Sequence, residues 1–299
     1  MGVVNITQDS FSDGGQWLDP TRAVAHAERL LDDGADLLDL GAESSRPGGG
    51  AYGQGAKGIA VEEEVRRLIP VLKELRPRTN KPISVDTRKP EVARQALEVG
   101  ADLINDIDGL TDPEMLDLVA RNKCPVVIMH SRGALATMQQ DIDFEDVATE
   151  VCDELAAAAN RAQQAGLSQI ILDPGIGFGK SFTHNLELTN QLSRIADLGH
   201  PVLFGSSRKG YLGQLTGRPP QRRIAASLAS VARVLGSAAI VRVHDVAETV
   251  DFLRVWYAHD QPRLAFANSD PGEEPSGTAG DAQAGKAFSQ QPFPESGSS

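Results

Sequence analysis

Short apolar segments alternate with longer segments of helical periodicity along almost the whole chain. Each apolar run has the length of a buried strand, and in the stretch that follows it apolar residues recur every three or four positions. Strands are expected at 2–6, 36–41, 82–86, 102–107, 125–130, 169–173, 201–205 and 239–244. Helices are expected at 20–34, 60–76, 90–99, 113–121, 144–166, 184–198, 222–236 and 245–258.

Eight strand-helix units are what a closed (β/α)8 TIM barrel requires, and the usual length of such a barrel is about 250 residues. An open, doubly wound α/β sheet is the alternative, but the number of repeats favours closure. We predict a single catalytic barrel domain at 1–259. Residues 260–299 are rich in Gly, Ser, Pro and Ala, and we expect a disordered tail there. Because the first strand begins at Met1, either the start is truncated or the barrel closes without a plug beneath it.

Composition narrows the classes of partner. The formal charge of −12 argues against a nucleic-acid partner, because such binding needs a basic surface. No apolar run approaches the roughly 20 residues that cross a bilayer, so no membrane partner is expected. Cys124 and Cys152 suit buried thiols in a reducing compartment, with a disulfide between them as the alternative. We therefore expect a soluble, cytoplasmic protein.

Polar residues lie near the carboxyl end of every predicted strand. In a TIM barrel the carboxyl ends of the strands meet at one mouth, where ligands bind. Any single residue of this kind could instead cap the next helix, but their convergence on one rim indicates a site. The strand-end residues are Asn5, Asp39, Asp86, Asn105, Asp106, His130, Asp173, Ser207–Lys209, Arg242 and His244.

The chemistry of these residues divides into two kinds. The carboxylates and amide of Asp86, Asn105 and Asp173 suit a flat heterocycle that carries ring N–H, amino and carbonyl groups. The cationic or polar side chains at the same mouth suit a phosphate or diphosphate, and they are Arg46, Lys209, Arg242 and His244. Asn5 could ligate Mg²⁺ through its amide oxygen. Arg242 could alternatively form an ion pair with a carboxylate inside the barrel.

Three loops after predicted strands are rich in glycine. The loops 7–15 and 41–58 are long and without apolar periodicity, which is typical of functional lids or of disorder. The third, LDPGIGFGK at 172–180, resembles a phosphate loop but lacks the G-x-x-x-x-G-K-[ST] spacing. We expect its glycines to let Phe178 swing beside a ligand. A short helix is expected to start after FGSSRKG at 204–210.

The motifs MGVVNITQDSFSDGG, DLGAESSRPGG, ISVDTRKPEVA, LINDI, VVIMH, LDPGIGFGK, FGSSRKG and VRVHDV resemble, in this order, the signatures of the dihydropteroate synthase family. The resemblance covers residues 1 to about 258. It implies a transferase of folate biosynthesis, in which 6-hydroxymethyl-7,8-dihydropterin diphosphate condenses with 4-aminobenzoate to give 7,8-dihydropteroate and diphosphate. It also implies a Mg²⁺ cofactor, a homodimer and competitive inhibition by sulfonamides.

The same resemblance implies a role for each matching residue. The pterin would be held by Asp86, Asn105, Asp173, Lys209, Ile107 and Met129. Diphosphate would be held by Asn5, Arg242 and His244, with Asn5 also a ligand of the metal. Aminobenzoate would be held by Phe11, Ser45, Arg46, Pro47, Phe178 and Ser207. The catalytic residues would be Asp13, Lys209 and Arg46.

Two other interpretations remain open at the level of sequence. A pterin-dependent methyltransferase barrel shares the Asp86, Asn105 and Asp173 pattern, but it needs neither SSRPG nor SSRKG and implies a corrinoid partner. A pterin-binding protein without catalytic activity would retain the pterin pocket and lose the aminobenzoate side.

Overall fold

The computed structural model describes residues 1–6, 20–44, 58–134, 137–140 and 142–260. The chain divides into two compact units, Met1–Arg254 and Val255–Ser299, and only the first six residues of the second are described. The predictions for both long loops, and for the tail beyond Asp260, lie outside the described residues.

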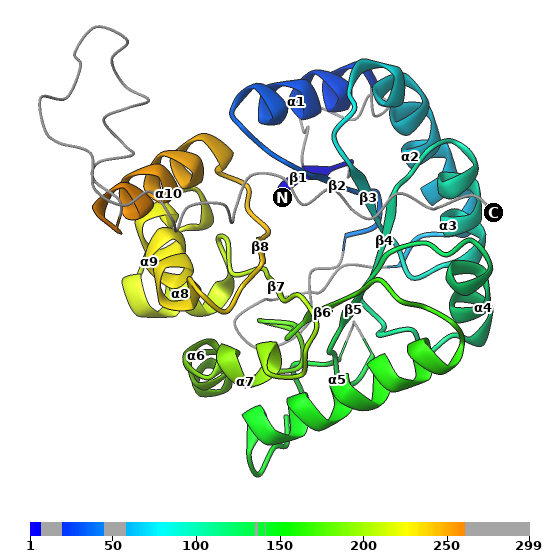
Figure 1. Ribbon diagram of the computed structural model, residues 1–299. Helices are drawn as coiled ribbons and strands as arrows, with labels where there is room; N and C mark the ends of the chain where they lie inside the picture. Colours follow the sequence, from blue (N-terminus) through cyan, green and yellow to red (C-terminus); the bar gives the residue numbers. More distant parts are fainter. Residues whose placement is uncertain (7–19, 45–57, 135–136, 141, 261–299) are drawn as a thin grey trace, which may run out of the picture. The chain divides into compact units, whose positions relative to one another are not determined.

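A closed ring of parallel strands forms the centre of the first unit (Figure 1). β1 to β6 pair in sequence order, and β7 pairs with β8. Single bridges from Leu172 to Val202 and from Gly2 to Val243 join these two sheets on both sides. The predicted barrel is therefore confirmed, and the open sheet is excluded. The strands are β1 Gly2–Asn5, β2 Leu38–Gly41, β3 Ile83–Asp86, β4 Leu103–Asp106, β5 Val126–Met129, β6 Ile170–Asp173, β7 Leu203–Phe204 and β8 Ile240–Val241.

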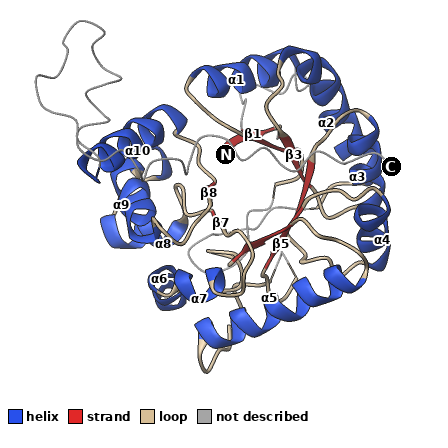
Figure 2. Cartoon of the chain, viewed as in Figure 1, coloured by secondary structure: helices blue, strands red, loops and turns tan. Residues whose placement is uncertain are grey.

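Helices surround the strand ring, as Figure 2 shows. They are α1 Pro20–Asp32, α2 Val61–Leu75, α3 Pro90–Glu98, α4 Pro113–Arg121, α5 Val147–Gln164, α6 Phe182–Asn190, α7 Leu192–Ala196, α8 Gly210–Thr216, α9 Ile224–Val234 and α10 Val246–Asp260, with short 3-10 helices at η3 Arg76–Arg78 and η4 Pro220–Arg222. The segment predicted as one helix at 184–198 is two helices. Its chain leaves helical geometry at Gln191, where φ is −108° and ψ is 21°.

Local sequence accounts for where several helices begin. Asp112 caps α4 by accepting a hydrogen bond from the backbone of Glu114, and Pro113 follows at a position where no donor is needed. Asp146 caps α5 in the same way, and Ser181 with His184 forms a reciprocal capping box at α6. These caps fix the point at which each strand-to-helix loop ends.

The barrel interior is apolar at one level and polar at the next. Leu103, Val127, Ile171 and Leu203 form a buried cluster inside the ring. Side chains two positions apart on a strand share a face. Asn105 and Asp173 therefore lie on the same interior face as Leu103 and Ile171, one level nearer the carboxyl ends. This alternation places polar groups at the mouth above a closed apolar floor.

Two further predictions can be compared with the described part of the chain. Cys124 and Cys152 are both buried free thiols, so the alternative of a disulfide between them is not observed. Among the described residues, none of the helices has the length and apolar character that crossing a membrane requires.

Candidate active site

A pocket at the carboxyl ends of the strands brings the predicted pterin-binding residues together. All six belong to its lining, along with Phe178 and Arg242. Two lining residues, Ile176 and Gly205, were not predicted. The full lining is Asp86, Asn105, Ile107, Met129, Asp173, Ile176, Phe178, Gly205, Lys209 and Arg242.

Arg242 connects two carboxylates inside this pocket. Its guanidinium lies 2.6 Å from Asp39 Oδ2 and 3.1 Å from Asp86 Oδ2. Asn105 also donates its amide N–H to Asp39 Oδ2, at 3.3 Å. The alternative of an ion pair inside the barrel is therefore observed, and the same guanidinium still lines the pocket. A diphosphate would meet a cation that is already oriented.

Asp39 is a site residue to which sequence reasoning assigned no role. It is fully buried, and its Oδ1 has no hydrogen-bond partner among the described residues. The signal was present, because Asp39 is one of the polar residues in a predicted strand. Only the closed barrel shows that it faces Arg242, which lies 203 residues later in the chain.

Burial and neighbouring charges shift the pKa values in this pocket. Burial, together with the charge of Asp39, raises the pKa of Asp86 to about 7 despite the opposing guanidinium of Arg242. Burial and Arg242 lower the pKa of Lys209 to about 8. Burial also raises the pKa of Asp173, although the Gly175 N–H at 2.7 Å favours its ionised form. Burial, and then the neighbouring Asp39 carboxylate, explain why Asp86 binds a proton so readily.

The raised pKa of Asp86 predicts a pH-dependent loss of stability. A carboxyl group that binds its proton more tightly in the folded state favours folding below the unfolded pKa, near 4, and that contribution is lost as pH rises through about 7. Asp86→Asn removes this titration. We expect its free energy of unfolding, relative to the parent, to rise between pH 4.5 and 7.5 by on the order of 1–3 kcal/mol.

Urea unfolding at several pH values measures this difference. Asp36→Asn is the control, because the Asp36 side chain is 93% exposed and the same substitution is then made at the surface. A pH-independent difference between Asp86→Asn and the parent would contradict the raised pKa.

Of the other predicted residues in the described part, Phe178 and Arg242 line this pocket, and Asn5, Ser207 and His244 do not. Lys209 Nζ lies 4.1 Å from the centre of the Phe178 ring, a cation–π contact. The Ser207 hydroxyl lies 3.1 Å from His244 Nδ1 and accepts the His244 backbone N–H at 3.2 Å. Burial and Arg242 lower the pKa of His244 to about 3, so its imidazole is neutral. Asn5 is half-buried at the last position of β1.

Five predicted site residues cannot be placed: Phe11, Asp13, Ser45, Arg46 and Pro47 lie outside the described residues. The chain on either side of 45–57 is held by one ionic cluster, which sequence reasoning missed. Glu43 accepts hydrogen bonds from Ile59 N and Lys89 Nζ, both at 2.9 Å, and from Arg88 Nε at 3.0 Å. Lys89 also bonds the Ile59 carbonyl and the buried Glu64. This cluster ties both flanks of that loop to the start of α3.

Not every polar strand end serves the pocket. Asp106 accepts the backbone N–H groups of Asp108 and Leu110, at 2.9 and 3.0 Å. It therefore holds the turn after β4, in which Leu110 has a φ of 54°. Asp106 thus has a local structural role, but it does not cap the next helix, because the N-cap of α4 is Asp112.

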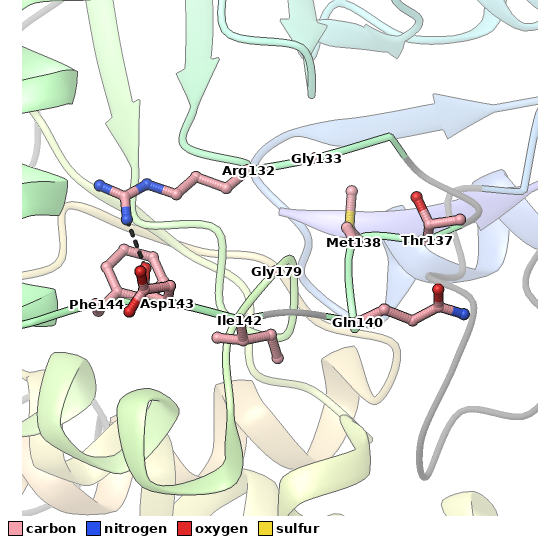
Figure 3. Close-up of a pocket in the computed structure, with 9 residues that line it drawn as sticks. All are labelled: Arg132, Gly133, Thr137, Met138, Gln140, Ile142, Asp143, Phe144 and Gly179. Carbon is pink, nitrogen blue, oxygen red and sulfur yellow. Dashed lines mark hydrogen bonds between the residues drawn. The ribbon is translucent and has the colours of Figure 1, made fainter.

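A second cavity of about 560 Å³ lies beside the loop that follows β5 (Figure 3). Figure 3 shows the Arg132 side chain reaching the Phe144 ring and the Asp143 carbonyl, which accepts its hydrogen bond at 2.8 Å. Arg132 is also paired with Glu150 and Glu154. Because the Arg132 guanidinium is already paired with these two carboxylates, it should attract an anion into the cavity only weakly.

A TIM barrel with a polar, charge-paired pocket at its carboxyl mouth belongs to a class of small-molecule enzymes. Residues 1–244 match the family described as pterin binding enzyme, and the chain belongs to that family. Dihydropteroate synthase of Escherichia coli K12 is 43% identical over 258 residues, which cover 85% of this chain and 89% of the relative. The Synechocystis enzyme of the same name is 41% identical over 260 residues, with coverage of 85% and 88%.

Solved structures give the same result. Xanthomonas albilineans dihydropteroate synthase with 4-aminobenzoic acid is 46% identical, with a TM-score of 0.80 and coverage of 87% of this chain and 92% of that one. The Thermus thermophilus enzyme in complex with 6HMPPP is 42% identical, with a TM-score of 0.73 and coverage of 86% and 92%.

Proposed function

We propose that this protein is a dihydropteroate synthase of folate biosynthesis. It is a transferase that joins the methylene group of 6-hydroxymethyl-7,8-dihydropterin diphosphate to the amine of 4-aminobenzoate and releases diphosphate. The observation that carries the proposal is the convergence of Asp86, Asn105, Asp173 and Lys209 on one pocket that Arg242 also lines. The relatives named above share the activity in their names.

The pterin fits the polar and apolar halves of this pocket. Asp86, Asn105 and Asp173 supply carboxylate and amide groups for the ring N–H, amino and carbonyl groups. Ile107, Met129 and Phe178 belong to one apolar cluster beside them, suited to the faces of a flat ring. A ligand without these polar groups would leave buried carboxylates unpaired, so the pocket should discriminate strongly.

Diphosphate departure is the step in which charge develops. Breaking the C–O bond gives negative charge to the leaving diphosphate, which we assign to Arg242, His244 and Asn5, and positive charge to the pterin methylene, which Asp13 would stabilise. The aromatic amine is nucleophilic without a strong base. Lys209, beside Phe178, would hold aminobenzoate with Ser207, Phe11, Ser45, Arg46 and Pro47.

Mg²⁺ fits this site as a cation held mainly by its substrate. No cluster of three or more His, Cys, Asp or Glu side chains in the described residues could hold a metal by itself. Mg²⁺ commonly takes one or two protein ligands and several substrate phosphate oxygens. The Asn5 amide oxygen would be its protein ligand here, and the bound ion would neutralise charge on the departing diphosphate.

Product formation by purified protein tests the function. A mixture of the protein, Mg²⁺ and both substrates should yield 7,8-dihydropteroate and diphosphate in equal amounts. Chromatography measures the two products. Pterin binding without product would instead support a non-catalytic pterin-binding protein. Methyl transfer from a pterin to a corrinoid would support the methyltransferase alternative.

Three finer properties belong to the same proposal. The protein acts in the cytoplasm, assembles as a homodimer and is inhibited by sulfonamides that compete with 4-aminobenzoate. The exposed side chains of Val255 and Tyr257 on α10 support a further protein contact in that segment. Sedimentation analysis and inhibition kinetics measure the last two properties.

Deleting residues 261–299 is expected to leave folding and turnover unchanged. The composition of this segment provides few aliphatic residues for a core. Thermal unfolding and turnover of the shortened chain check this prediction. A melting temperature lower by more than about 5 °C, which corresponds to roughly 1–2 kcal/mol, would show that the segment contributes to the fold.

A further inference from the structure

The turn between β6 and α6, from Asp173 to Lys180, packs directly against the backbone that follows β5. Gly175, Gly177 and Gly179 all have positive φ, at 66°, 84° and 61°. A Cβ atom on Gly175 would lie 1.8 Å from the His130 carbonyl oxygen, and one on Gly179 would lie 2.7 Å from the Arg132 carbonyl oxygen. The glycines expected to let Phe178 swing thus have a packing role, since they allow two backbones to touch.

Lys180, at the end of this turn, is a buried amine whose contacts are neutral groups, and burial lowers its pKa to about 7. Its side chain is 1% exposed. Its Nζ lies 3.0 Å from the Phe178 carbonyl oxygen, 2.8 Å from His130 Nδ1 and 3.4 Å from the His130 carbonyl oxygen. These three acceptors match the three donors of an ammonium group. Lys180 therefore joins the turn to the end of β5.

His130 is set to accept this hydrogen bond. Burial and the charge of Lys180 lower the pKa of His130 to about 2, so its imidazole is neutral. When Lys180 is protonated its ammonium has no lone pair, so Nδ1 accepts and the ring proton is on Nε2. Glu154 Oε2 lies 3.1 Å from Nε2, although outside hydrogen-bond geometry, and Arg132 is paired with Glu154. The residue after β5 thus presents a fixed acceptor to Lys180.

The turn is held at its other residues as well. Asn185 Oδ1 accepts the Gly177 N–H at 2.6 Å, and Gln139 Nε2 donates to the Gly177 carbonyl at 2.7 Å. At Phe178 the carbonyl is bound by Lys180, and the ring on the same residue faces Lys209 Nζ at 4.1 Å. Fixing the carbonyl limits where the ring can go.

This turn separates two spaces. Phe178 lines the active-site pocket, and Gly179, one residue later, lines the second cavity of about 560 Å³ (Figure 3). A turn that borders a cavity among the described residues can move away from the active-site pocket unless its own contacts hold it in place. Among the described contacts, Lys180 supplies the hydrogen bond that reaches the Phe178 backbone from a side chain in the interior.

We infer that Lys180 is a positioning residue, which holds the Phe178 ring against Lys209 and so shapes the aminobenzoate side of the pocket without contacting a substrate. The inference rests on the proposed function for the identity of that substrate. It assigns no contact with the pterin to Lys180, because Asp86, Asn105 and Asp173 are held by the strands β3, β4 and β6 to which they belong.

The test compares Lys180→Met with the parent. Methionine fills similar space without donors, so the turn should be free to move. We expect the KM for 4-aminobenzoate to rise about tenfold, the change that one buried hydrogen bond to a charged group can produce, while the Kd for the pterin substrate changes less than about twofold. Amide hydrogen exchange in the peptide covering 174–180 should become faster.

Val119→Ala is the matched control for stability alone. Val119 is fully buried in α4, so its truncation should lower the melting temperature without changing the KM for 4-aminobenzoate or exchange at 174–180. An equal change of both substrate constants in Lys180→Met, or an unchanged KM, would overturn the inference.

Gln139→Leu provides a second variant with a milder change. It removes the bond to the Gly177 carbonyl from a half-buried position, and it should shift the KM for 4-aminobenzoate in the same direction by a smaller factor. If Lys180→Met does not fold, the KM of Gln139→Leu for 4-aminobenzoate tests the inference instead. An unchanged KM in Gln139→Leu then contradicts the inference. If the parent shows no turnover, the proposed function fails, and the exchange measurement still decides whether Lys180 holds the turn.

Discussion

Replacing Arg242 by alanine is expected to lower both turnover and stability strongly. The Arg242 side chain is only 21% exposed and bonds both Asp39 and Asp86. Removing it leaves two buried carboxylates without their cation, which typically costs about 3–5 kcal/mol of folding free energy. The same change removes the group that faces the departing diphosphate, so kcat/KM should fall by at least about 100-fold.

A second substitution separates the two effects of losing Arg242. The double variant Arg242→Ala/Asp39→Ala lacks one of the two unpaired carboxylates. Part of the lost folding free energy should therefore return, while turnover should stay low. Arg94→Ala is the control, because Arg94 is a surface residue with a 45% exposed side chain, and exposed ion pairs contribute little to stability. Turnover close to that of the parent in Arg242→Ala would exclude its role in diphosphate departure.

Gly175→Ala is expected to disrupt the turn after β6 and abolish most activity. The new Cβ would lie 1.8 Å from the His130 carbonyl oxygen, at a φ of 66° that alanine already disfavours. The clash is with backbone, so either the turn or the end of β5 must move. Asp173 and Phe178 would move with the turn. We expect a loss of about 2–4 kcal/mol in unfolding free energy and at least a 100-fold loss in kcat/KM.

Gly166→Ala separates the clash from the backbone strain. Gly166 has a φ of 96°, but nothing lies within 4 Å of the Cβ that alanine would add. Its substitution should cost only about 1 kcal/mol and leave kcat/KM unchanged. Equal losses at the two glycines would show that strain, and not the approach of the turn to His130, determines the effect of Gly175→Ala.

The sequence predicted the fold well because its signals are local. Each predicted strand is a short apolar run with a polar residue near its carboxyl end, and each predicted helix has its own periodicity. The position of Gln191 was harder to predict, because the break between α6 and α7 interrupts the backbone without a Pro or Gly. The location of the site at the mouth of the barrel could be predicted from topology alone, since parallel strands place all their carboxyl ends together.

The pairing of side chains across the barrel could not be predicted in this way. Asp39 and Arg242 meet only when the ring closes, and Lys180 reaches His130 only when the turn folds back on β5. In sequence, Asp39 looks like any polar strand residue, and Lys180 looks like the end of an incomplete phosphate loop. Asp39 and Arg242 are 203 positions apart in the chain, and Lys180 and His130 are 50 positions apart. The roles of Asp39 and Lys180 therefore depend on contacts between residues far apart in the chain.

The central claim is that one pocket at the barrel mouth recognises a pterin. Its most direct test is titration calorimetry, in which the dihydropterin diphosphate is added to the parent protein and to Asp173→Asn. We predict one binding site per chain in the parent. Affinity should be weaker by at least about 100-fold in Asp173→Asn, because an amide N–H would replace a buried acceptor that faces ring donors. Equal affinity of the two proteins would contradict the account.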